Sequence, residues 1–229
     1  KLYNNRWILE RMTRDYPLRI DVNQFKEASQ HLHQLIIKIR NVKDLETLRG
    51  YEGQGAVSYN KVFDSMILHQ KEDFYFHGRS RRPPLDKLNA LLSFAYTLLA
   101  NDYTSALESV GLDAYVGFLH RDRPGRASLS LDLMEELRGI YADRFVLTLI
   151  NKKIIKNDDM YTKENGSVLL KEEGMRTFLD AWQNKKQELI THPYLSEKIP
   201  WGLVPYAQAL LLARYLRGDI DEYPVFLWK

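Results

Sequence analysis

Apolar side chains recur every three or four residues along most of this chain, the spacing that gathers them on one face of an α-helix. In the segment from residue 21 to residue 40, the apolar residues of this stripe are Phe25, Leu32, Leu35, Ile36 and Ile39. Similar stripes run through residues 87–100, 130–153 and 201–217. The sequence therefore predicts a mainly α-helical protein.

One segment departs from this pattern and indicates β structure. The dipeptide Asn165-Gly166 lies between the segments MYTKE and SVLL. An Asn-Gly pair in this setting is a strong signal for a hairpin with a two-residue turn. Helical spacing resumes from Gly174 to about Thr191. We expect residues 1–229 to form a single multi-helix domain with one small β-hairpin near Asn165-Gly166.

Composition excludes several classes of protein. Hydrophobic residues make up 45% of the 229 residues, which leaves ample material for a core. The chain contains no cysteine, so disulfides, thiol catalysis and cysteine-based zinc sites are excluded. The longest mostly apolar run, residues 90–100, is shorter than the ~20 residues that a membrane-spanning helix needs. The motifs of serine hydrolases, P-loop proteins and zinc metalloproteases are also absent.

The first segment with possible chemistry is FLHRDRPGRASLSLDLMEELR, which contains His120, Asp132 and Glu135. The spacing of three between Asp132 and Glu135 puts both carboxylates on one helix face. Carboxylate oxygens are the ligands that Mg²⁺ and Mn²⁺ prefer, and Mn²⁺ also accepts an imidazole. A solvated acidic helix face and a structural histidine would explain the same residues.

A second such segment is RGYEGQGA, which places Glu52 among Gly50, Gly53 and Gly55. Each glycine inside a helix costs roughly 1 kcal/mol, so three within six residues suggest a close approach of the backbone to something. Either a ligand near Glu52 or a crossing between two helices would require such small residues.

Two loops are rich in arginine although the net charge of the chain is only +3. The first contains Arg79, Arg81 and Arg82 after a run of aromatic residues, and the second contains Arg121, Arg123 and Arg126. Arginine grips phosphate groups, and aromatic rings stack on bases. A solvated basic loop is the other explanation. Because the total charge gives no argument for nucleic acid, the evidence must come from where these residues lie.

Taken together and in order, these segments resemble the CRISPR-associated adaptation integrase, the Cas-one family. The matching segments are LRGYEGQGAVSY, FHGRSRRPPLDKLNALLSFAYTLL, GLDAYVGFLH, SLSLDLMEELR, THPYLSEKIPWGLVPYAQALLLARYLRGD and YPVFLWK. The beginning and the end of the chain most resemble the type I-C branch.

The resemblance implies a metal-dependent DNA integrase and endonuclease that inserts spacer DNA into the repeat array by 3′-hydroxyl attack on a phosphodiester. The metal ligands of the family, for Mg²⁺ or Mn²⁺, fall on Glu52, His120 and Glu135, and Asp132 matches a neighbouring acidic residue of the same catalytic site. DNA-contacting positions of the family fall on Arg79, Arg81, Arg82, Arg123 and Arg126.

The resemblance also implies partners: double-stranded and branched DNA, a second copy of the chain in a homodimer, the small Cas-two protein and, in the type I-C setting, a Cas-four nuclease. It implies a cytoplasmic protein without membrane contact. Members of the family carry a small β-rich domain before the helical one, and no part of this chain, which starts at Lys1 rather than Met, reads as that domain. The alternative hypothesis is therefore a catalytically inert DNA-binding or scaffold fragment that needs the N-terminal domain and its partners.

Overall fold

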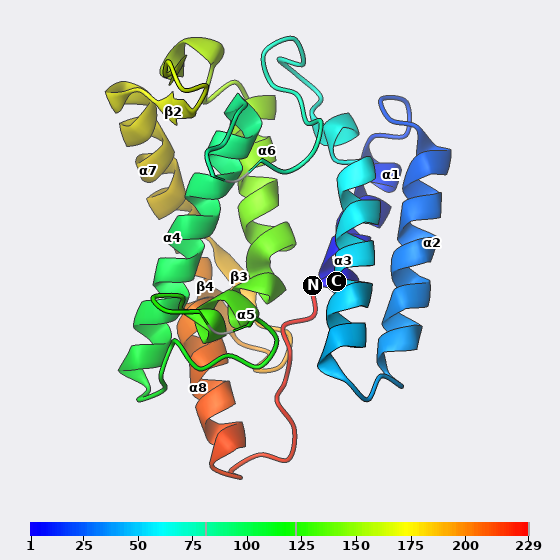
Figure 1. Ribbon diagram of the computed structural model, residues 1–229, viewed down its shortest axis with the longest axis vertical. Helices are drawn as coiled ribbons and strands as arrows, with labels where there is room; N and C mark the ends of the chain where they lie inside the picture. Colours follow the sequence, from blue (N-terminus) through cyan, green and yellow to red (C-terminus); the bar gives the residue numbers. More distant parts are fainter. Residues whose placement is uncertain (81, 122, 229) are drawn as a thin grey trace.

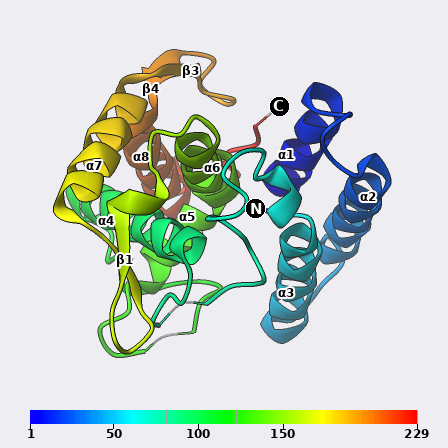
Figure 2. The same ribbon diagram turned by 90° about the horizontal axis from the view of Figure 1, so that it is seen from above.

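The computed structural model describes residues 1–80, 82–121 and 123–228. Helices account for 59% of the chain and strands for 5%, so the prediction of a mainly α-helical fold is confirmed. The helices form two groups, which stand apart in the views of Figures 1 and 2. Within the described residues, no helix is both long enough and apolar enough to cross a membrane.

The first group consists of three helices: α1 (Leu2–Asp15), α2 (Val22–Ile39) and α3 (Leu45–Lys61). The Asp21 carboxylate accepts the backbone N–H groups of residues 23 and 24 at 3.0 and 3.2 Å, so it caps α2. Asp44 caps α3 in the same way, by accepting the Thr47 N–H at 2.8 Å. The apolar stripe of α2 supplies much of the core of this group through Phe25 and other fully buried residues.

The second group is built around two long helical stretches, α4 (Lys87–Ser109) and the stretch from residue 128 to residue 151. The latter was expected as one helix, but a π-helical segment (Arg138–Asp143) separates α5 (Ser128–Leu137) from α6 (Arg144–Asn151). Helices α7 (Glu172–Gln187) and α8 (Val204–Leu216) complete the group. π-Helical segments of this kind occur frequently at functional sites.

The C-terminal tail helps to join the two groups. Asn4, in the first turn of α1, is buried and donates its amide to the carbonyl oxygens of Glu136 and Phe226 at 2.7 and 2.8 Å. The Asn4 carbonyl oxygen accepts the Trp228 N–H at 2.9 Å. Because the Phe226 ring is itself buried, the tail contributes both to the core and to the attachment of α1 (Figure 1).

Two small hairpins are present where one was expected. Strands β1 (Met160–Thr162) and β2 (Val168–Leu170) pair in an antiparallel way around Asn165-Gly166, so the predicted hairpin is confirmed, although residues 163–167 form its turn instead of two residues. Strands β3 (Leu189–Thr191) and β4 (Lys198–Pro200) form the second hairpin. The prediction that the helix starting near Gly174 reaches Thr191 is therefore wrong.

The physical reason for the second hairpin is tertiary. The His192 side chain is fully buried, and its Nδ1 accepts the backbone N–H groups of Tyr194 and Leu195 at 3.3 and 3.2 Å. Its Nε2 lies 3.1 Å from the side-chain oxygen of Gln208 on α8. These bonds reverse the chain after β3, and periodicity along the sequence does not reveal them.

The three glycines of α3 have different surroundings, which leads to a stability prediction. A Cβ added at Gly53 would meet open space, whereas a Cβ at Gly55 would meet the buried side chains of Leu2 and Leu32. We expect Gly53→Ala to raise the free energy of unfolding by about 1 kcal/mol through helix propensity. We expect Gly55→Ala to lower it, since overpacking a core costs about 1–3 kcal/mol.

Urea denaturation of both variants measures this difference. Gly50→Ala is the matched control, because Gly50 also has open space around it and should respond like Gly53. A Gly55→Ala variant as stable as Gly53→Ala would contradict the helix crossing at this position.

Candidate functional site

A cavity of about 660 Å³ lies where the two helix groups meet. Three of the predicted site residues line it: Glu52 from α3, His120 from the loop between α4 and α5, and Glu135 from α5. These residues are separated by as many as 83 positions in the sequence, since the first is residue 52 and the last is residue 135. The fold therefore brings into one cavity the side chains that the sequence placed in separate motifs.

Glu52 and Glu135 share a cation. The Lys1 ammonium contacts a carboxylate oxygen of Glu52 and lies 2.8 Å from Oε2 of Glu135. The guanidinium of Arg138 lies 2.8 Å from the other oxygen of Glu135. Although burial raises the pKa of Glu135, the charges of Arg138 and Lys1 outweigh this effect and hold it at about 2. Glu135 is therefore ionised at neutral pH.

Asp132 does not line the cavity, but its carboxylate fixes the position of His120. Its carboxylate accepts the backbone N–H groups of Phe118, Leu119 and His120 at 2.6, 2.9 and 2.9 Å. It also lies 2.6 Å from Nδ1 of His120. Burial raises the pKa of Asp132, but these hydrogen bonds have the larger combined effect and lower it. With the Nδ1 proton donated to Asp132, His120 presents the lone pair of Nε2.

The loop that carries His120 passes very close to α5. A Cβ at Gly117 would lie 2.7 Å from Cβ of Ser128 and 2.9 Å from Oδ2 of Asp132. Only glycine leaves room for this approach, which lets one carboxylate collect three successive backbone donors. The sequence pattern GFLH followed by an aspartate on α5 is the local origin of the arrangement.

A second set of buried polar groups orients Arg138. The Arg138 guanidinium lies 4.4 Å from the ring centre of Tyr96 on α4, and the Arg79 guanidinium lies 5.1 Å from the same ring. The Tyr96 hydroxyl donates a hydrogen bond to Asp143, whose side chain is buried. Burial raises the pKa of Asp143 to about 6, although Arg138 and the Tyr96 hydroxyl oppose the increase. Because Arg138 contacts both Glu135 and Tyr96, it connects this set to the carboxylates.

Both arginine-rich loops reach the cavity. Arg79, Arg123 and Arg126 line it, whereas Arg82 is exposed and does not. Arg81 lies outside the described residues. The rim also contains arginines that were not singled out as DNA contacts: Arg49 donates to the Leu119 carbonyl at 2.7 Å, and Arg121 lies 2.7 Å from a carboxylate oxygen of Glu46. The cavity thus combines the carboxylates of Glu52 and Glu135 with these arginines, which we call its basic rim.

The donor set fits a divalent cation. Two carboxylates and an imidazole are the oxygen and nitrogen donors that Mn²⁺ accepts, and Mg²⁺ uses the carboxylates. The Lys1 ammonium stands in for such an ion, since it already bridges Glu52 and Glu135. As the side chains lie, no group of three His, Cys, Asp or Glu residues in the described ranges forms a metal site. Binding of a cation by these residues therefore requires Lys1 to move.

Sequence reasoning missed four residues that shape the cavity: Lys1, Tyr96, Arg138 and Asp143. Arg138 follows Glu135 by three positions on the same helical stretch, a spacing that favours an ion pair and was a usable signal. The sequence offers no comparable signal for Lys1, Tyr96 or Asp143. Their roles arise only because α1, α4 and the π-helical segment converge.

Comparisons with known proteins give a consistent result. The sequence matches the family described as CRISPR associated protein Cas1 over residues 1–184. It is 48% identical, over 229 residues, to a CRISPR-associated endonuclease Cas1 of Chlorobaculum tepidum, covering all of this chain and 67% of that protein. It is 40% identical to a CRISPR-associated exonuclease Cas4/endonuclease Cas1 fusion of Geobacter sulfurreducens, over 81% of this chain and 34% of the fusion.

Solved structures with the same fold include a casposase bound to an integration product, with a TM-score of 0.78 and 26% identity. That match covers 96% of this chain and 62% of the casposase chain. A partial Cas6-RT-Cas1–Cas2 complex matches all of this chain and 65% of its own, with a TM-score of 0.81 and 25% identity. This chain thus spans less than two thirds of either solved chain. With the family match over most of its length and the high identity to a Cas1 endonuclease, the chain belongs to the Cas1 family.

Proposed function

We propose that this chain is the catalytic part of a DNA integrase and endonuclease of CRISPR adaptation, which inserts spacer DNA into the repeat array. The observation that carries the proposal is the convergence of Glu52, His120 and Glu135 in one cavity with a basic rim. Membership of the Cas1 family supports it, as does the similarity to a casposase captured with its integration product. The type I-C branch stays a prediction.

Glu52, His120 and Glu135 would hold the divalent cation, Mg²⁺ or Mn²⁺, as the resemblance implied. When bound, the ion would neutralise charge on the phosphate oxygens and favour the deprotonated nucleophile. Asp132 fixes the orientation of the His120 ring, and Arg138 keeps Glu135 ionised by its charge. The Glu135 carboxylate is therefore held in the ionised state that metal binding needs.

Other residues of the cavity would bind and orient the DNA. Arg79, Arg123 and Arg126 line the cavity, and in this proposal they contact DNA phosphates. Arg81 and Arg82 stay predictions as additional DNA contacts. A spacer 3′-hydroxyl in line with the phosphorus gives strand transfer, and water in the same position gives cleavage. Because phosphate contacts release counterions, DNA binding by this rim should weaken steeply with salt.

The partners follow from the family. A Cas2 protein is the proposed partner, since one similar solved structure is a complex containing Cas1 and Cas2. A Cas4 nuclease is supported by the fusion of Cas4 and Cas1 in a relative. Double-stranded and branched DNA as substrates, a homodimer and a cytoplasmic location remain part of the proposal.

One structural feature favours the alternative hypothesis of a catalytically inert DNA-binding or scaffold module. The Lys1 ammonium bridges Glu52 and Glu135 and competes for the place of a cation. In an inert module this ion pair is permanent, so divalent metal neither binds nor supports turnover. In the catalytic module a divalent cation displaces the ammonium, because its double charge interacts more strongly with two carboxylates.

Removal of Glu52 or His120 tests the proposed ligands. We expect Glu52→Ala and His120→Ala each to abolish Mn²⁺-dependent cleavage and integration of branched DNA, because each removes a donor to the cation. Glu108→Ala is the matched control, since Glu108 is an exposed helical glutamate that does not line the cavity. Gel assays with purified protein measure both activities. Full activity of either ligand variant would show that the site is assigned wrongly.

Replacement of Lys1 tests its ion pairs with Glu52 and Glu135. We expect Lys1→Met to lower the melting temperature in EDTA, because two carboxylates then lie together without their shared cation. We expect added Mn²⁺ to raise the melting temperature of Lys1→Met more than that of the unaltered chain. A ligand at 100 times its Kd stabilises a protein by about 2.7 kcal/mol, which a melting curve resolves easily.

The control for Lys1→Met is the double variant Lys1→Met/Glu52→Gln, which lacks one of the two carboxylates. Its response to Mn²⁺ should be much smaller than that of Lys1→Met. Equal responses of the two variants to Mn²⁺ would mean that the metal binds elsewhere, and no response in either would support the inert module.

Asp132 is expected to act through His120. We expect Asp132→Asn to reduce Mn²⁺ affinity and activity about 10- to 100-fold, the usual effect of removing a group that orients a ligand. Asp113→Asn is a matched control on the same loop, where Asp113 accepts the Tyr115 N–H at 2.8 Å and lies outside the cavity. Calorimetric titration with Mn²⁺ separates the two. Unchanged affinity in Asp132→Asn would remove Asp132 from the site.

A further inference from the structure

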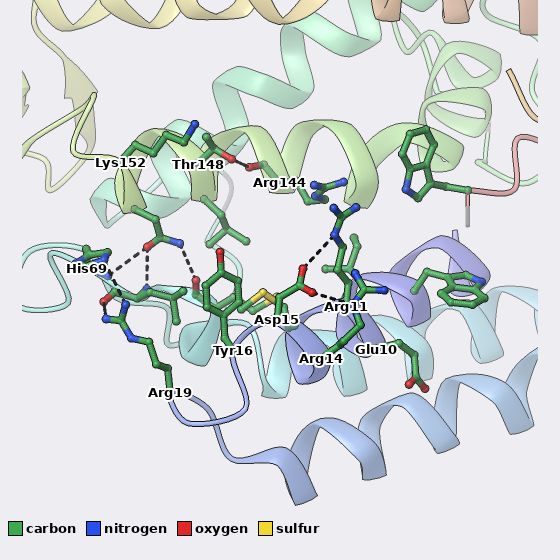
Figure 3. Close-up of a pocket in the computed structure, with 18 residues that line it drawn as sticks. Glu10, Arg11, Arg14, Asp15, Tyr16, Arg19, His69, Arg144, Thr148 and Lys152 are labelled. Atoms are coloured by element: carbon green, nitrogen blue, oxygen red, sulfur yellow. Dashed lines mark hydrogen bonds and ion pairs between the residues drawn. The ribbon is translucent and has the colours of Figure 1, made fainter. Parts of the chain in front are cut away.

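A second cavity, of about 760 Å³, lies between α1 and α6 (Figure 3). We refer to it as the α1–α6 cleft. Its charged residues on the α1 side are Arg11, Arg14 and Asp15, and the loop after α1 adds Arg19. On the α6 side they are Arg144 and, at the end of the helix, Lys152. Glu10 also lines the cleft, so five cationic side chains face two carboxylates.

Most of the cations on the α1 side have partners within the protein. Asp15 lies 3.3 Å from Arg11 and 2.8 Å from Arg14, and both are ion pairs. Arg19 donates to the carbonyl oxygen of Leu68 at 2.6 Å. The α1 side therefore holds three arginines against the two carboxylates of Glu10 and Asp15, which leaves one excess positive charge.

The α6 side adds two more positive charges, those of Arg144 and Lys152. Arg144 begins α6 and Lys152 follows its last residue, so the two residues lie about 12 Å apart along the helix axis. In the described part of the chain, neither guanidinium nor ammonium makes an ion pair or a hydrogen bond. Figure 3 shows the Arg144 side chain reaching from α6 toward Arg11 and Asp15 on α1.

Arg144 is the most constrained of these residues. It is half-buried, and burial followed by the neighbouring charge of Arg11 lowers the pKa of its guanidinium. Buried charges are rare in proteins unless they are paired. The charges of Asp15 and Glu188 reach Arg144, but neither carboxylate forms an ion pair with it, so its guanidinium can bind an external anion such as a phosphate.

We propose that the α1–α6 cleft binds the phosphodiester backbone of a nucleic-acid strand outside the catalytic cavity, with Arg144 and Lys152 on separate phosphates. The inference rests on the proposed action on DNA. The Arg144 fork matches two oxygens of one phosphate, which a lysine does not achieve. Tyr16, 41% exposed at the edge of the cleft, offers a ring face for an unpaired base.

The α1–α6 cleft and the cavity of Glu52 and Glu135 are bordered by the same two elements. Asp143 lines the catalytic cavity, and the next residue, Arg144, lines the α1–α6 cleft. Helix α1 contributes to both, with Asn5 lining the first cavity and Ile8 lining the second. A strand held in the cleft would thus contact α1 and the helical stretch from residue 128 to residue 151, which also border the first cavity.

The test is DNA affinity without metal. We expect the double variant Arg144→Gln/Lys152→Gln to bind a labelled branched DNA in EDTA at least about tenfold more weakly, by fluorescence anisotropy. The slope of log Kd against log salt should fall by about two, one for each lost phosphate contact. The control Lys163→Gln/Arg176→Gln removes the same charges from the β1–β2 turn and α7, and should bind like the unaltered chain.

Three further measurements give each outcome a meaning. Arg144→Lys keeps the charge, so it should keep the salt slope but bind DNA more weakly. Melting curves of all variants show whether they fold. Inorganic phosphate at matched ionic strength should displace DNA only weakly; displacement at low millimolar phosphate would identify a free-anion site and overturn the proposal. Stronger binding of polyglutamate than of DNA would overturn it in favour of an acidic peptide.

The two proposals fail in distinguishable ways. If the unaltered chain does not bind branched DNA at all, the proposed action on DNA fails. If the unaltered chain binds and Arg144→Gln/Lys152→Gln binds equally well, or no worse than Lys163→Gln/Arg176→Gln, only the α1–α6 cleft is refuted.

Discussion

A largely buried carboxylate, Glu135, is the group on which the arrangement of this protein depends. Burial raises its pKa, but Arg138 and Lys1 each lie 2.8 Å from one of its oxygens and hold the pKa at about 2. A pKa below the usual value stabilises the folded state at neutral pH, and this contribution disappears as the pH falls toward 2. Because Lys1 also contacts Glu52, one ionic group connects α1, α3 and α5.

This connection explains why the cavity forms where it does. The helices α1–α3 pack mainly among themselves, and so do the helices that follow Lys87. Polar contacts at the junction, including those of Asn4 with the C-terminal tail, hold α1 against the π-helical segment. The cavity thus lies in a polar region between two apolar cores. Charged groups lie there because burying them in either apolar core would cost free energy.

The helical stretch from residue 128 to residue 151 borders both cavities. An uninterrupted α-helix from residue 128 to residue 151 advances by about 100° per residue. Asp143 and Arg144 are neighbours and point in different directions, so Asp143 lines the cavity of Glu52 and Glu135 while Arg144 lines the α1–α6 cleft. One helical stretch therefore supplies an acidic group to the first cavity and a cation to the proposed strand-binding surface.

The sequence by itself determined the helical class, the Asn165-Gly166 hairpin and the motifs that hold Glu52, His120, Asp132 and Glu135. These features are local, since periodicity, capping and turn chemistry act within a few residues. Only the tertiary structure decided which of the three glycines sits at a helix crossing, that Asp132 stands behind His120, and that Lys1 bridges two glutamates. It also decided the second hairpin and the charge balance of the α1–α6 cleft. Each of these depends on contacts between segments far apart in the chain, whose energies have no counterpart in local sequence pattern.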